Sequence, residues 1–185
     1  GTVTVGDSEC TSPYYASGAI VCSVPSGEGN VDVSLVLYDE TSNTFSGFSY
    51  AVPTISSLSA GSDFVTEGGF DLTITGTNFG DTPTVEIGGQ SCTDPVVSEE
   101  DTRIVCSVPS GSGLQTLVLD VAGLEVTYPF AYADPSIDEN GISADDYGTD
   151  GAGSLTIAGA NFGDANSDIS VTVGGADCPV NSWSH

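Results

Sequence analysis

Short segments in which apolar and polar residues alternate dominate this chain of 185 residues. In residues 70–75 the apolar Phe70, Leu72 and Ile74 alternate with polar residues, and residues 117–121 show the same period of two. Such alternation predicts half-buried β-strands. No apolar stripe with the 3.6-residue period of a helix is long enough to predict one.

Turn-forming residues separate these segments at intervals of about 8–12 residues. The turn signals are Gly68-Gly69, Asn78–Pro83, Gly88-Gly89, Pro109–Gly113 and Ala122-Gly123. About seven short strands within some 80 residues are typical of an antiparallel sandwich of immunoglobulin type. The fold class expected for the chain is therefore all-β.

Three sequence blocks recur along the chain. Leu72–Asp81 returns as Leu155–Asp164, and Val21–Gly29 returns as Val105–Gly113. A third block occurs three times and ends at Cys10, Cys92 and Cys178. In this order, the blocks predict a C-terminal part of one domain at 1–51, a complete domain at 52–133 and an N-terminal part of another at 134–185.

The complete repeat resembles the IPT/TIG family of immunoglobulin-like domains. The motif that carries the resemblance begins at Pro53-x-Ile55, continues through Gly68–Gly80 and Val85–Cys92, and ends at Ile104–Pro109. The likeness extends over the partial repeats on either side. It implies tandem immunoglobulin-like β-sandwiches in an extracellular or cell-surface protein, and a scaffold without shared chemistry.

The charge balance of the chain restricts its partners. The chain has 26 acidic residues and a single basic residue, Arg103, which gives a formal net charge of −25. Such a field opposes contact with nucleic acid and with anionic membranes. With 38% hydrophobic residues the chain is nevertheless too apolar for a charged disordered tail. A folded protein with neither of these partners is expected.

The five cysteines fall into repeat-related positions. The repeat predicts two equivalent disulfides, one between Cys10 and Cys22 and one between Cys92 and Cys106. Cys178 is the counterpart of Cys10 without its partner. Either that partner lies further along a longer polypeptide, or Cys178 bonds to a neighbouring chain. Disulfide use predicts an extracellular or cell-surface location.

Catalytic chemistry is not expected in this chain. His185 is the only histidine, so a hydrolytic triad has no base in the body of the protein. The acidic residues are spread over strand faces and turns, as in a solvated surface. We therefore expect no enzyme activity and no cofactor.

One acidic segment is a candidate calcium site. Asp138, Asp145, Asp146 and Asp150 lie close together in the sequence, and calcium takes 6–8 oxygen ligands. The segment lacks the ligand spacing of an EF-hand loop. The alternative is a solvated acidic loop without a bound ion.

Two further features indicate contacts outside the chain. Ser12-Pro13-Tyr14-Tyr15 resembles the Ser-Pro sequences that carry O-linked sugar in cell-wall glycoproteins. Trp183 is the only tryptophan, and it is a candidate contact with the next subunit; the alternative is a frayed end.

An incomplete sandwich leaves unpaired strand edges, which favour association. Residues 134–185 of one copy and 1–51 of the next together supply a whole domain, so head-to-tail contact predicts a linear fibril. The block that ends at Cys10 and Cys178 is then present twice, which argues against simple strand donation. The alternatives are a longer covalent array of repeats, and an adhesion or receptor ectodomain fragment that binds a protein or glycan ligand.

Overall fold

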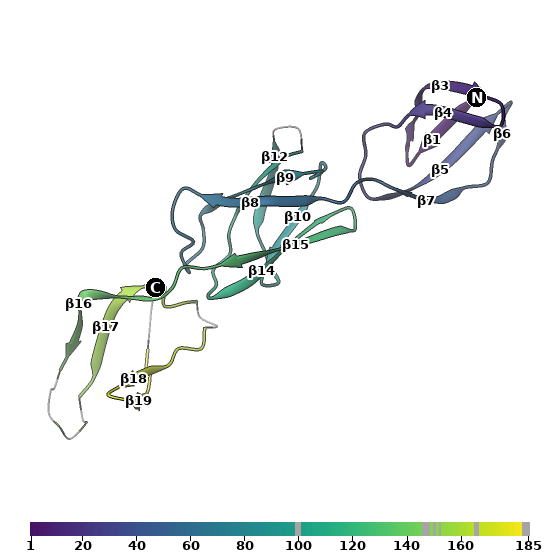
Figure 1. Cartoon of the computed structure of the whole chain (residues 1–185). Coiled ribbons are helices and arrows are strands. Elements are labelled where there is room, and N and C mark those ends of the chain that lie inside the picture. Colours follow the sequence, from purple (N-terminus) through teal and green to yellow (C-terminus); the bar gives the residue numbers. More distant parts are fainter. Residues whose placement is uncertain (99–100, 146–148, 150, 152, 165–166, 183–185) are drawn as a thin grey trace.

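The computed structural model describes residues 1–98, 101–145, 149, 151, 153–164 and 167–182. Every regular element in these residues is a β-strand. The strands form three units that follow one another in a row (Figure 1). Within the described residues, no helix is long and apolar enough to cross a membrane.

The middle unit is a sandwich of two antiparallel four-stranded sheets. One sheet has the order β12-β13-β9-β8 and the other β11-β10-β14-β15. The strands are β8 (Thr54–Ala60), β9 (Asp71–Thr77), β10 (Thr84–Ile87), β11 (Gln90–Ser91), β12 (Thr93–Ser98), β13 (Arg103–Ser107), β14 (Leu114–Val121) and β15 (Leu124–Ala131).

The core lies between the two sheets of the middle unit. Strand β9 buries Leu72 and Ile74 from one sheet, and β14 buries Leu117 and Leu119 from the other, all with no exposed surface. The residues between them point outward, so the period of two in the sequence corresponds to the two faces of each sheet. Burial of these side chains is the main force that holds the two sheets together.

A close backbone approach explains one glycine of the repeated motif. Gly76 of β9 lies against the backbone of β8, where a Cβ atom would collide with the Thr54 carbonyl oxygen. In the third unit, a Cβ on Gly159 would collide with the Ser136 carbonyl oxygen in the same way. A larger residue at either position would push the two strands apart.

The first unit has one five-stranded sheet and a separate hairpin. The hairpin, β3–β4, corresponds in the repeat to β12–β13, and the described first unit has no counterpart of β8 and β9. The strands are β1 (Thr2–Val5), β2 (Ser8–Glu9), β3 (Thr11–Ala16), β4 (Ala19–Ser23), β5 (Asn30–Leu37), β6 (Glu40–Thr41) and β7 (Phe45–Ser49).

The described third unit consists of two strand pairs, which correspond to β8–β11 of the middle unit. These strands are β16 (Ser136–Ala144), β17 (Leu155–Ala160), β18 (Val171–Val173) and β19 (Ala176–Cys178). The prediction of an all-β chain with one complete immunoglobulin-like sandwich between two partial ones is confirmed.

Candidate assembly surfaces

The first and middle units meet through two turns. The carboxylate of Glu28, in the turn before β5, accepts hydrogen bonds from the Asp81 backbone N–H (2.9 Å) and the Thr82 hydroxyl (3.3 Å). Gly80 lies against the same carboxylate in the left-handed backbone region, with φ of 60°. A side chain at Gly80 would therefore separate the two turns.

The repeat counterparts of these two turns meet between the middle and third units. Ser112 is the repeat counterpart of Glu28, and its hydroxyl lies 3.0 Å from that of Ser167. The Ser167 hydroxyl also lies 3.0 Å from the carboxylate of Asp164, the buried counterpart of Asp81. In addition, the Thr66 backbone N–H donates to Oδ1 of Asn161 (3.3 Å). Equivalent turns thus form both junctions.

Repeated asparagines fasten each linker to the unit that follows it. Asn78 and Asn161 both occupy the left-handed region, with φ of 60° and 59°. Nδ2 of Asn78 donates to the Val52 carbonyl (3.1 Å), and Nδ2 of Asn161 donates to the Asp134 carbonyl (3.3 Å). Proline follows both carbonyl groups and restricts the backbone further. The linkers are therefore held at both repeat boundaries.

The first unit has an open side. A hollow of about 280 Å³ lies between the β3–β4 hairpin and the five-stranded sheet. In the middle unit, Leu72 and Ile74 of β9 stand opposite Cys106 and Ile104 of β13 and fill this part of the sandwich. The apolar residues that line the hollow are Val3, Ile20, Cys22, Val33, Leu35 and Phe45.

Three strands with exposed side chains carry no charge. Strands β3, β4 and β17 contain no acidic or basic residue, although the chain has 26 acidic residues. Three apolar or aromatic side chains on the β3–β4 hairpin are exposed: Tyr14 at 68%, Val21 at 60% and Tyr15 at 49%. Natural proteins commonly protect free strand edges with charged side chains. The uncharged edges in this chain are therefore candidate pairing surfaces.

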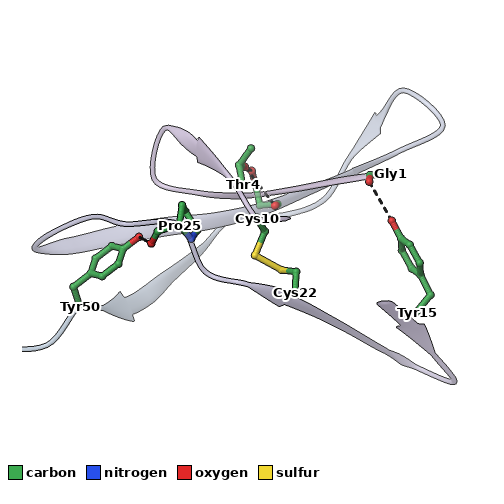
Figure 2. Close-up of a disulfide and its surroundings, with 8 residues drawn as sticks. Gly1, Thr4, Cys10, Tyr15, Cys22, Pro25 and Tyr50 are labelled. Carbon is green, nitrogen blue, oxygen red and sulfur yellow. Dashed lines mark hydrogen bonds between the residues drawn. A yellow bond between two sulfur atoms is a disulfide. The ribbon is translucent and has the colours of Figure 1, made fainter. Parts of the chain in front are cut away.

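The structure joins both predicted cysteine pairs. A disulfide connects Cys10, which directly follows β2, to Cys22 of β4 and so links the hairpin to the five-stranded sheet (Figure 2). The Cys92–Cys106 disulfide lies in the core of the middle unit. Cys178, at the end of β19, is half-buried and has a free thiol. Its predicted bond to another chain stays a prediction.

The candidate calcium ligands are only partly described by the structure. Asp138 is exposed on β16, and Asp145 follows the end of that strand. Asp146 and Asp150 lie outside the described residues, as does Trp183. Among the residues that the structure describes, no three His, Cys, Asp or Glu side chains gather as metal ligands would. The calcium site and the Trp183 contact stay predictions.

Sequence reasoning missed the residues that form the junctions. Glu28, Ser112 and Asp164 lie within repeated blocks, and that repetition was the available signal. It showed that the turns are equivalent but not that they touch, because Glu28 and Asp81 are more than 50 residues apart.

Tyr132 provides a test of the second junction in solution. Its hydroxyl donates to the Pro109 carbonyl (2.8 Å), and its side chain is 4% exposed. Burial, with a smaller contribution from the Asp164 carboxylate, raises the pKa of Tyr132 from 10.0 to about 12. In the unfolded chain the tyrosine ionises first, so its contribution to stability is complete below pH 10 and decreases as the pH rises toward 12.

An ultraviolet titration of the tyrosines tests this expectation. We expect a tyrosine step near pH 12, and we expect Tyr132→Phe to remove that step. Asp164→Asn should lower the pKa of Tyr132 without removing the step. If no tyrosine titrates near pH 12 while the protein remains folded, the buried environment of Tyr132 is wrong.

The fold and these surfaces define a class of protein: a tandem array of immunoglobulin-like β-sandwiches whose units meet through equivalent turns. The model of the IPT/TIG domain family matches residues 1–50, 53–133 and 147–185. The chain therefore belongs to the IPT/TIG domain family.

One solved structure similar to this chain is the full extracellular region of plexin A4, domains 1 to 10. The two chains are 22% identical, with a TM-score of 0.41, and the match covers 76% of this chain. This chain corresponds to 13% of the plexin chain. No curated protein matches the chain.

Proposed function

We propose that this chain is a structural subunit of an extracellular linear fibril or surface appendage, in which IPT/TIG domains follow one another head to tail. The observation that carries this proposal is the recurrence of one junction. The Glu28 turn lies against the Asp81 turn, and the equivalent Ser112 turn lies near the equivalent Asp164 turn, although the hydrogen bonds differ. A contact that repeats without closing on itself propagates along a line.

The covalent features of the chain support a location outside the cell. Both units that contain a cysteine pair hold a disulfide, and disulfides persist in oxidising compartments. The Cys92–Cys106 disulfide is buried, so it strengthens a sandwich of only about 80 residues. The proposed role is mechanical and architectural rather than catalytic.

O-linked glycan is part of the proposal. Ser12 and Pro13 lie on β3, where every residue is exposed, and Tyr14 and Tyr15 beside them present aromatic surface to solvent. This segment can therefore accept a sugar without unfolding the unit. Mass spectrometry of native material, before and after chemical removal of O-linked sugar, tests this part of the proposal.

Negative-stain electron microscopy and multi-angle light scattering on one purified sample test the fibril. Filaments with an axial repeat of about 70–90 Å, the length expected for two sandwiches, would support it. Because copies with a charge of −25 repel one another, filaments should lengthen as the ionic strength rises. Monomers of 18.6 kDa plus glycan at every ionic strength would overturn the fibril and favour an adhesion or receptor ectodomain.

A further inference from the structure

We propose that strand β17 of one copy of this chain pairs with strand β4 of a second copy and completes the sandwich of its first unit. The inference rests on the proposed fibril and names the surfaces that form its subunit contact. Both strands have one pairing partner among the described strands: β4 pairs with β3, and β17 pairs with β16. Each therefore presents a free edge.

The middle unit shows how these two strands fit together. Its β13 and β9 are the repeat counterparts of β4 and β17, and they form an antiparallel pair at the centre of a sheet. There, Leu72 and Ile74 of β9 have no exposed surface. Their counterparts Leu155 and Ile157 in β17 are only half-buried. Strand β17 thus carries the apolar side chains of a central strand, but these side chains are not fully buried as they are in a central strand.

The hollow in the first unit is complementary to these side chains. It is lined by Ile20 and Cys22, which are the counterparts of Ile104 and Cys106. In the middle unit, Ile104 and Cys106 stand opposite Ile74 and Leu72. The same pairing places Ile157 opposite Ile20 and Leu155 opposite Cys22, so both apolar side chains enter the hollow. Outside it, Thr156 stands opposite Val21.

Charge favours this pair of edges over other contacts between copies. Neither β4 nor β17 contains a charged residue, whereas the exposed strand β16 beside β17 carries Asp138 and Glu139. Two chains of net charge −25 attract only where apolar contact outweighs repulsion. The uncharged edges provide such a contact.

The positions of the two strands make the pairing intermolecular. The β3–β4 hairpin and the β16–β17 pair lie in the units at opposite ends of the row (Figure 1). Strand β1, the repeat counterpart of β18, is paired with β5 over its whole length, so its position in the first unit is already occupied. The duplicate block, β18–β19, therefore stays outside the completed sandwich. One copy thus joins the next in a chain that does not close.

Disulfide trapping tests both the contact and its register. All variants carry Cys178→Ser, so that the native free thiol does not react. A Val21→Cys copy is mixed with a Thr156→Cys copy under mild oxidation, and non-reducing electrophoresis detects the dimer. We expect this pair to cross-link, and an Ala19→Cys copy to cross-link with an Ala158→Cys copy in the same way.

A pair that is out of register is the matched control. The control mixes an Ala19→Cys copy with a Ser154→Cys copy. Ala19 is the first residue of β4 and Ser154 immediately precedes β17, and the proposed register separates these two positions by four residues. Cysteines whose Cα atoms are more than about 7 Å apart do not form a disulfide without backbone movement. This mixture should therefore stay monomeric on the gel.

A charge placed in the hollow gives an independent measurement. Ile157→Asp should weaken association, measured by light scattering, by about a hundredfold or more, because the carboxylate would be buried without a partner. Thr156→Asp adds the same charge one residue away on the outer face and should weaken it far less. Circular dichroism establishes that both variants remain folded.

The outcomes separate this inference from the proposed function. Filaments with the expected cross-links support both. Filaments without these cross-links, or with equal cross-linking of the out-of-register pair, overturn the β4–β17 contact and leave the fibril standing. If the protein stays monomeric at every ionic strength, a second copy does not occupy the hollow. Both the β4–β17 contact and the fibril are then wrong.

Discussion

Leu72→Ala should lower the free energy of unfolding of the middle unit by about 3–5 kcal/mol, the range for a buried leucine whose removal leaves a cavity. Leu72 has no exposed surface, and it lies between the two four-stranded sheets of the middle unit. Close packing around it prevents the core from collapsing onto the space that the side chain leaves. Hydrogen exchange of the β9 and β13 amides, followed by mass spectrometry, measures the loss in this unit alone.

Leu155→Ala is the matched control for Leu72→Ala. It removes the same atoms from the equivalent position of β17, where the side chain is half-buried. In a dilute monomeric sample the unfolding free energy should fall by less than about 1 kcal/mol, as for a change outside a packed core. Equal losses for the two variants would contradict the difference in packing between the middle and third units.

Removal of the Cys92–Cys106 disulfide should have an effect of similar size. The double variant Cys92→Ser, Cys106→Ser opens a loop with a sequence separation of 14 residues, which corresponds to a loss of about 3 kcal/mol. Both cysteines are almost fully buried, so the serine hydroxyls also enter an apolar core. Chemical denaturation followed by near-ultraviolet circular dichroism measures the loss.

The Cys10–Cys22 disulfide provides the comparison. Its double serine variant should leave the unfolding of the middle unit unchanged, because that disulfide lies within the first unit. It should instead release the β3–β4 hairpin from the five-stranded sheet (Figure 2). A large change in the middle unit would mean that the two units unfold together.

The repeated motif gains a physical explanation from the structure. Asn78 holds the linker, Phe79 fills the core, and Gly80 permits the contact with Glu28. Three consecutive residues therefore serve the linker, the sandwich and the junction. In their return as Asn161, Phe162 and Gly163, the asparagine holds the next linker and the glycine lies near the Ser112 turn, whereas Phe162 is only half-buried.

By itself, the sequence determined the strands, their faces and the order of the repeats. Alternation of apolar and polar residues is a local signal, and it identified the inward positions of β9 and β14 before any contact was known. The repeat also identified the cysteines that the structure pairs. These features depend on neighbouring residues, or on comparison of one repeat with another.

Only the tertiary structure decided which turns meet and which edges remain free. Glu28 contacts Asp81 because the folded first and middle units lie next to each other in one orientation. No local sequence pattern encodes that orientation. Ile20 and Ile104 have similar neighbours in sequence, yet Ile104 is fully buried and Ile20 lines a hollow. The physical reason is that burial depends on the strand that lies alongside, and that strand is distant in sequence.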